Sequence, residues 1–97
     1  MGIDKNQWDL SFKPKAFEDR DFFKRSGNIP LMKKIKNLLE ELELHPETGT
    51  GKPEKLKENL SGYWSRRINS KHRIIYTIDA NEKIVEIYSF HSHYFAK

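Results

Sequence analysis

Residues 72–91 read HRIIYTIDANEKIVEIYSFH, and this stretch decides the fold. Its two halves, HRIIYTID at 72–79 and KIVEIYSFH at 83–91, are rich in the β-branched and aromatic side chains that favour strands. Between them, residues 79–82 (DANE) have the composition of a turn. The stretch therefore predicts two antiparallel strands joined by a tight connection.

The two-residue alternation of a strand separates the side chains of residues 72–79 onto two faces. One face carries Ile74, Tyr76 and Ile78, and the other carries Arg73, Ile75 and Thr77. Because the helices can cover only one face of the sheet, we expect the face with Arg73 to be partly open.

A third antiparallel strand is predicted upstream of this pair. Residues 63–69 have strand character and run into a tight Asn69-Ser70-Lys71 turn. Arg66 and Arg67 are adjacent in this strand, so we expect their side chains to point to opposite faces. The segment before it, residues 46–53 (PETGTGKP), has the composition of a loop.

Two helices and one more strand are predicted nearer the N-terminus. Residues 8–12 (WDLSF) alternate like a half-buried strand, and a first helix is expected from Pro14 to a stop at Gly27. A second helix begins near Pro30 and ends at His45-Pro46, because a residue before proline is disfavoured in a helix. We therefore expect an α+β fold with the order β-α-α-β-β-β, in which two helices pack on one face of a mostly antiparallel sheet. The apolar stripe of the second helix consists of Met32, Ile35, Leu38, Leu39 and Leu42.

The length of 97 residues fits one domain that spans 1–97. No apolar run approaches the roughly 20 residues that cross a bilayer, and the N-terminus lacks the basic-then-apolar pattern of a secretory signal. The chain has no cysteine, which excludes a disulfide framework, a zinc-thiolate site and a cysteine nucleophile. The expectation is a cytoplasmic protein with no membrane partner.

The net charge of +4 is unevenly distributed along the chain. Between residues 52 and 73, seven basic residues oppose two acidic ones, so this segment alone carries +5. A local basic field of this kind suits a polyanion such as RNA, although a solvated surface has the same composition. The basic residues are Lys52, Lys55, Lys57, Arg66, Arg67, Lys71 and Arg73.

Cleavage of RNA without a metal needs a base for the ribose 2′-OH, an acid for the departing 5′ oxygen and cations for the phosphate. Tyr94 or Phe95 can add an aromatic surface for an unstacked base. Each candidate also fits a plain solvated side chain, and His91 with His93 leaves a metal site open as an alternative. The candidate groups for the reaction itself are Glu54, Lys57, Arg67, Arg73 and His93.

Four segments of the chain form a specific pattern. They are GKPEKLK at 51–57, NLSGYWSRRI at 59–68, HRIIY at 72–76 and His93-Tyr94. The pattern closely resembles the YoeB/Txe family, toxins of the RelE/ParE superfamily, and the similarity is dense from Pro46 to Tyr94. The run NLSGYWSRRI is too long and unusual for chance to be a good explanation.

The resemblance implies a RelE-like microbial ribonuclease fold. It also implies a type II toxin that cleaves mRNA in the ribosomal A site and inhibits translation, with no metal or other cofactor. The family's general base falls on Glu54, and the arginine that stabilises its transition state falls on Arg73. The histidine and tyrosine that close these proteins fall on His93 and Tyr94, with His93 as the general acid.

The resemblance also extends to residues that bind RNA. The family's lysine after the GKPE motif falls on Lys57, and the second arginine of its W-S-R-R run falls on Arg67. We expect their basic neighbours Lys52 and Arg66 to bind RNA as well.

The C-terminus departs from the family pattern in two ways. Three residues, 95–97, follow Tyr94, where family members usually end. His91 and Ser92 replace a charged or aromatic pair, which makes His91 a competing candidate for the acid.

The partners implied by the resemblance are mRNA, the ribosome and an antitoxin of the YefM/Phd type that folds as it binds. Family toxins often associate as dimers, so a homodimer is a further expectation. Two alternatives stay open on the residues alone. One is a non-catalytic module that binds RNA or the ribosome, and the other is a ParE-like inhibitor of DNA gyrase, although such relatives lack the Glu and His of the catalytic set. Co-repression of transcription with the antitoxin can coexist with the nuclease role.

Overall fold

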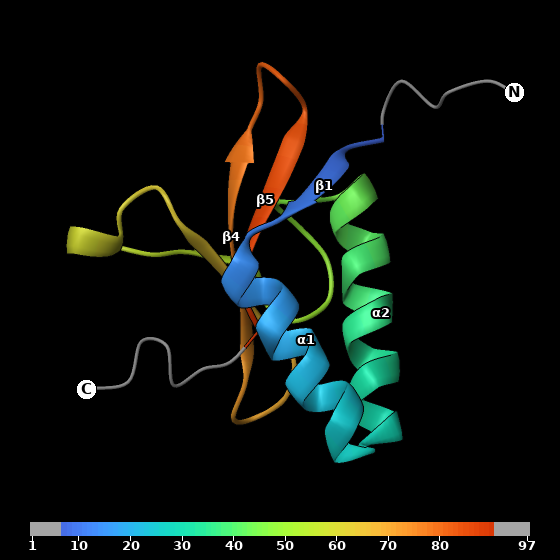
Figure 1. The fold of residues 1–97 in the computed structure, drawn as a ribbon. Helices are drawn as coiled ribbons and strands as arrows, with labels where there is room; N and C mark the ends of the chain where they lie inside the picture. The colour runs from blue at the N-terminus through green and yellow to red at the C-terminus, as the bar shows by residue number, and fades with distance from the viewer. Residues whose placement is uncertain (1–6, 91–97) are drawn as a thin grey trace, which may run out of the picture.

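Two helices cover one face of a five-stranded sheet in the computed structural model, which describes residues 7–90 (Figure 1). The sheet order is β1-β5-β4-β3-β2, and every neighbouring pair is antiparallel except the parallel pair β1–β5. The predicted α+β class is confirmed, with one addition, the two-residue strand β2. The elements are β1 (Asp9–Phe12), α1 (Pro14–Ser26), α2 (Ile29–Leu44), β2 (Glu54–Lys55), the short 3-10 helix η1 (Glu58–Leu60), β3 (Trp64–Arg67), β4 (Arg73–Asp79) and β5 (Ile84–Ser89).

Side-chain hydrogen bonds shape the two tight turns that join β3 to β4 and β4 to β5. The Asn69 side-chain oxygen accepts hydrogen bonds from the backbone N–H groups of Lys71 and His72, at 2.8 and 2.7 Å. Asp79 does the same for Asn81 and Glu82, both at 3.1 Å. Short polar side chains favour turns by this kind of bond. Both predicted turns are confirmed.

The two helices form an antiparallel hairpin over the sheet (Figure 1). Helix α1 starts at Pro14 and stops at Gly27, as predicted, and Gly27 has a left-handed φ of 73°. Asn28 then caps α2 by accepting a hydrogen bond from the Leu31 N–H at 3.1 Å. The apolar face of α2 completes the core against α1 and the sheet. Its buried residues are Leu31, Ile35, Leu38 and Leu42.

The sheet face away from the helices is only partly open. Arg73 and Thr77 are half-buried there, as expected. Ile75 lies on the same face but is 1% exposed, so the expectation of an open position fails at this residue. Its cross-strand neighbours Ser65 and Ser89 are also buried, and the β4–β5 register shifts at this point through a bulge. Small neighbours and the bulge thus surround Ile75 in the middle of this face.

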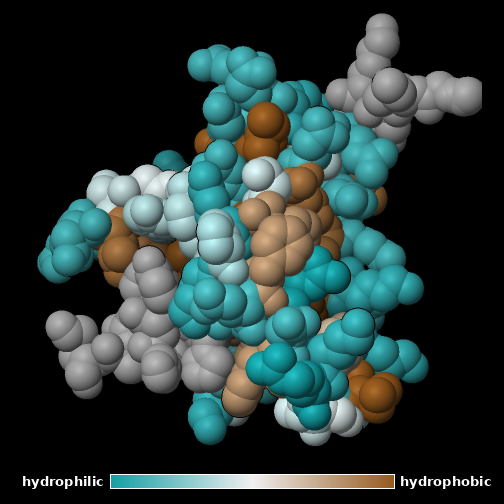
Figure 2. Space-filling model, viewed as in Figure 1, coloured by the Kyte–Doolittle hydropathy of each residue, from teal (hydrophilic) through white to brown (hydrophobic). Residues whose placement is uncertain are grey.

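A groove of about 650 Å³ lies on the helix side, between β1, α1 and α2. Leu10, Phe12, Met32 and Leu39 contribute apolar lining, and charged side chains such as Lys36 stand around it. Figure 2 shows hydrophobic side chains reaching the surface in the middle of this face, among hydrophilic ones. Within residues 7–90, no helix is long and apolar enough to cross a membrane.

Candidate active site

Glu54 and Arg73 meet on the open face of the sheet. Arg73 Nη1 lies 3.9 Å from Glu54 Oε1 and donates a long hydrogen bond of 3.4 Å to Ser65 Oγ. The pairing of strands explains the meeting, because Glu54 stands opposite Ser65 on β3 and Arg67 stands opposite Arg73 on β4. The side chains of Glu54 and Arg73 are 64% and 40% exposed, so both can reach a ligand. A carboxylate and two guanidinium groups therefore share one accessible face.

The backbone of residues 51–56 runs alongside β3, and this pairing places Glu54 at the edge of the sheet. The Arg67 N–H donates to the Gly51 carbonyl at 2.7 Å, and the Leu56 N–H donates to the Tyr63 carbonyl at 2.9 Å. Between these two bonds, Glu54 and Lys55 pair with β3 as strand β2. Glu54, which directly follows the predicted loop at 46–53, thus lies on a short edge strand that the sequence did not predict.

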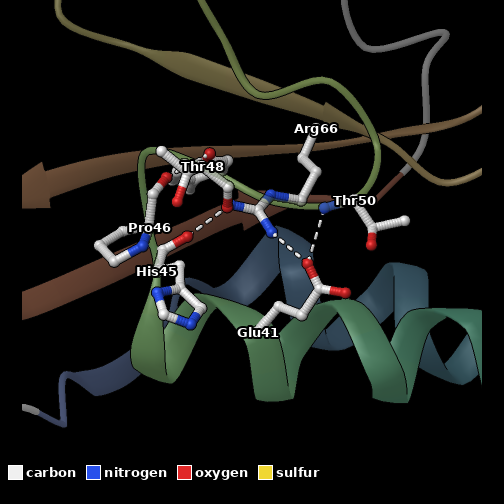
Figure 3. Close-up of polar contacts among 7 residues, drawn as sticks. Glu41, His45, Pro46, Thr48, Thr50 and Arg66 are labelled. Atoms are coloured by element: carbon white, nitrogen blue, oxygen red, sulfur yellow. Dashed lines mark hydrogen bonds and ion pairs between the residues drawn. The ribbon is translucent and has the colours of Figure 1, made fainter.

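Arg66 points away from this face and holds the preceding loop from behind (Figure 3). Its side chain is fully buried. Nη1 donates to Glu41 Oε1 at 3.1 Å, and Nη2 donates to the carbonyls of His45 and Thr48, both at 2.7 Å. The expectation that Arg66 contacts RNA is not met in this structure, because its guanidinium group is enclosed and already engaged. The predicted opposition of Arg66 and Arg67 is confirmed, since Arg67 is exposed.

Glu41 completes the support of this loop from α2. Its Oε1 accepts the Thr50 N–H at 2.8 Å as well as the Arg66 bond (Figure 3). Burial acts to raise the pKa of Glu41, but the Thr50 hydrogen bonds and the charges of Arg66 and His45 outweigh it and lower the pKa. Tyr76 Oη donates to the Pro46 carbonyl at 2.8 Å and adds a further tie. The loop before Glu54 is therefore held at several points.

Two of the remaining predicted site residues are exposed lysines, and the others lie outside the part of the chain that the structure describes. Lys52 is exposed with a left-handed φ of 52°, and Lys57 is exposed just before η1. His91, His93 and Tyr94 lie outside the described residues.

Asp19 is a buried residue of α1 that the sequence did not single out. Its Oδ2 accepts the Phe90 N–H at 2.9 Å, and its Oδ1 accepts Lys15 Nζ at 2.6 Å. The first bond fixes the end of β5, directly before the segment that contains His93. No spacing pattern could reveal it, because 71 residues separate the two partners.

Comparisons with known proteins agree with this fold. Residues 12–94 match the family described as YoeB-like toxin of bacterial type II toxin–antitoxin system. Toxin YoeB of Synechocystis sp. is 42% identical over 82 residues, which cover 84% of this chain and 94% of the relative.

Two solved structures from Staphylococcus aureus are also similar. The YoeB dimer has 43% identity and a TM-score of 0.76, and the match covers 91% of this chain and 99% of that chain. The YoeB–YefM complex has 44% identity and the same TM-score and coverage. The matched family spans most of the chain, including Glu54 and Arg73. The chain therefore belongs to the YoeB-like toxins of bacterial type II toxin–antitoxin systems.

Proposed function

We propose that the chain is a metal-independent endoribonuclease that cuts mRNA in the ribosomal A site and inhibits translation in the cytoplasm. The observation that carries the proposal is the open sheet face, where Glu54 Oε1 lies 3.9 Å from Arg73 Nη1. Arg67 stands beside Arg73 on the neighbouring strand. One carboxylate and two fixed cations suit a phosphodiester, since the carboxylate can accept a proton while the cations hold the phosphate.

In the proposed reaction, Glu54 takes the proton of a ribose 2′-OH, and the 2′ oxygen attacks the adjacent phosphorus. Arg73 and Arg67 balance the charge that grows on the non-bridging oxygens. The bond to the 5′ oxygen breaks, His93 gives that oxygen a proton, and a 2′,3′-cyclic phosphate remains. His93 as the acid and Tyr94 beside it enter this scheme from the family resemblance.

Other residues are proposed to bind the substrate rather than to react with it. Lys52 and Lys57 are exposed on the same edge of the molecule as Glu54 and would contact the RNA backbone. Arg66 belongs to neither group, because it supports the loop that carries Lys52 and leads to Glu54.

For partners, we propose an antitoxin of the YefM/Phd type and a homodimer of this chain. Support comes from the similar Staphylococcus aureus proteins, which are described as a YoeB–YefM complex and as a YoeB dimer. The +5 charge of residues 52–73 would attract an acidic antitoxin segment. Such a segment could block the open face directly.

The test is to induce the wild-type chain in cells and map the 5′ ends of transcripts. We expect cuts at fixed positions within translated codons. Glu54→Ala, Arg73→Ala and His93→Ala should each reduce cutting by about 10²-fold or more while the protein still binds ribosomes. Glu82→Ala, which removes an exposed carboxylate in the β4–β5 turn, should cut like the wild type.

Each alternative predicts a different result. Ribosome binding without cuts by the wild type would favour a non-catalytic binding module. Inhibition of DNA gyrase in vitro without mRNA cuts would favour a ParE-like toxin. Unchanged cutting by His93→Ala would transfer the role of the acid to His91.

A further inference from the structure

A second hollow adjoins the candidate active site at the edge of the sheet. It has a volume of about 320 Å³ and lies between α2, the loop at 51–52 and the turn after β3. We propose that this edge pocket binds a phosphate of the RNA strand next to the phosphate that is cut. The inference rests on the proposed function and adds a binding site, with Lys34 as a residue of it that the family pattern does not include.

Three cations from three separate elements line the edge pocket. They are Lys34 from α2, Lys52 from the loop and Arg67 from the end of β3. Within residues 7–90, none of the three forms an ion pair, and no carboxylate lines the pocket. Like charges held around one hollow repel one another, and an anion between them removes that repulsion. The pocket thus has the charge of an anion site.

The local structure constrains the Lys34 side chain and the backbone at Lys52 and Arg67. Lys34 is half-buried, whereas its neighbours Lys33 and Lys36 on the same helix are exposed. Lys52 has a left-handed φ of 52°, which costs a non-glycine residue of order 1 kcal/mol or more and persists only where the surrounding structure holds it. The bond from the Arg67 N–H to the Gly51 carbonyl fixes the loop against β3 at this point. The backbones at Lys52 and Arg67 are therefore held beside each other.

Arg67 joins the edge pocket to the candidate active site. It lines the pocket and stands opposite Arg73 in the β3–β4 pairing, and neighbouring strands lie about 4.8 Å apart. A strand of RNA whose reacting phosphate sits at Arg73 and Arg67 can thus present a neighbouring phosphate to Lys34 and Lys52. The turn adds the hydroxyl of Ser70 as a further donor. This continuity favours RNA over an acidic protein segment as the occupant.

The test measures binding without cleavage. The probe is a short 2′-O-methyl RNA, which has no free 2′-OH and cannot be cut by the proposed reaction. Its affinity is measured by fluorescence anisotropy at several salt concentrations for Lys34→Ala, Lys34→Gln and the control Lys33→Ala. Lys33 has the same charge on the same helix but lines the groove between β1 and α2 instead.

We expect Lys34→Ala to weaken binding about three- to tenfold, equally for probes of different base sequence, because a phosphate contact carries no sequence information. The slope of log affinity against log salt should fall by about 0.7, the value for one phosphate of a single strand. Lys34→Gln keeps most of the side-chain length and should show the same loss. Lys33→Ala should leave affinity and slope close to those of the wild type.

An equal loss of RNA affinity in Lys34→Ala and Lys33→Ala would contradict the proposal that the edge pocket binds a phosphate. So would binding of a glutamate peptide that depends on Lys34 while binding of the RNA probe does not. Failure of the proposed function would give a different result. The wild-type protein would then cut no mRNA, but its binding of the probe would still depend on Lys34. Normal cutting with no effect of either Lys34 variant on the probe would refute the edge pocket alone.

Discussion

Two adjacent arginines illustrate how strongly the environment decides the role of a residue. Arg66 is fully buried and donates to Glu41 and to two loop carbonyls, whereas Arg67 is exposed on the other face of β3. Leaving a buried hydrogen-bonding group without its partner typically costs about 1–3 kcal/mol, and an exposed substitution costs about 0.5 kcal/mol or less. The two positions therefore form a matched pair with opposite expected behaviour.

We predict that Arg66→Met lowers the free energy of unfolding by about 1–3 kcal/mol, because the carbonyls of His45 and Thr48 and the half-buried Glu41 carboxylate lose their donor. Arg67→Met should change stability little but weaken RNA binding. Urea unfolding of both variants measures the first effect, and anisotropy with an uncleavable RNA measures the second. Similar stability of the two variants would contradict the role of Arg66 as the support of the loop.

The alternation of a strand predicts that Arg66 and Arg67 separate, but it cannot say which of them turns inward. That choice depends on Glu41, which lies 25 residues earlier on α2. Asp19 poses the same problem, since its partner is 71 residues away. Contacts of this kind exist only after the elements have packed, so local patterns do not reveal them. The candidate residues Glu54 and Arg73 can be picked out from the sequence because a family motif marks both of them.

At the scale of elements, the helices and the three-stranded meander follow from periodicity and turn chemistry, and the structure confirms them. Strand β2 does not, because it has only two residues and pairs with β3 only when the loop before it is held. The parallel pairing of β1 with β5 also joins distant segments. The loop from His45 to Pro53 is thus the element whose conformation most directly positions Glu54.

We predict that Gly51→Ala displaces this loop and reduces both stability and RNA cutting. A Cβ at Gly51 would lie 2.6 Å from the Arg67 carbonyl oxygen, and φ there is +88°. Gly62→Ala is the matched control, because φ is +96° but nothing lies within 4 Å of its Cβ. The control should cost only about 1 kcal/mol of backbone strain and should retain cutting. Thermal unfolding and a cleavage assay on both variants decide the matter, and equal losses would argue against close packing of the loop.

At the scale of the whole molecule, the ion pair between Glu41 and Arg66 makes stability depend on pH. The pKa of Glu41 in the folded chain lies below its ordinary value of 4.5, so folding favours the ionised form. The carboxylate therefore contributes its full stabilisation above about pH 4.5, and this contribution is lost as pH falls through the lowered pKa of the folded state.

We predict that Glu41→Gln reduces stability near neutral pH, and that its gap to the wild type narrows as pH falls below 4.5 through the lowered pKa of Glu41, where the wild-type carboxylate loses its charge. The measurement is the urea midpoint of both proteins across this range. Glu40→Gln, one residue earlier and exposed, should run parallel to the wild type. A constant difference between Glu41→Gln and the wild type at all pH values would show that the charge of Glu41 is not what supports the loop.

The bond between the Phe90 backbone and Asp19 has a consequence for exchange between relatives. A backbone N–H is present whatever residue stands at position 90, but its acceptor is one particular carboxylate on α1. Grafting a C-terminus from another toxin onto this chain therefore keeps its anchor only if α1 retains a side-chain acceptor at position 19. A chimaera that joins α1 of one toxin to the last strand of another therefore has to match these two positions.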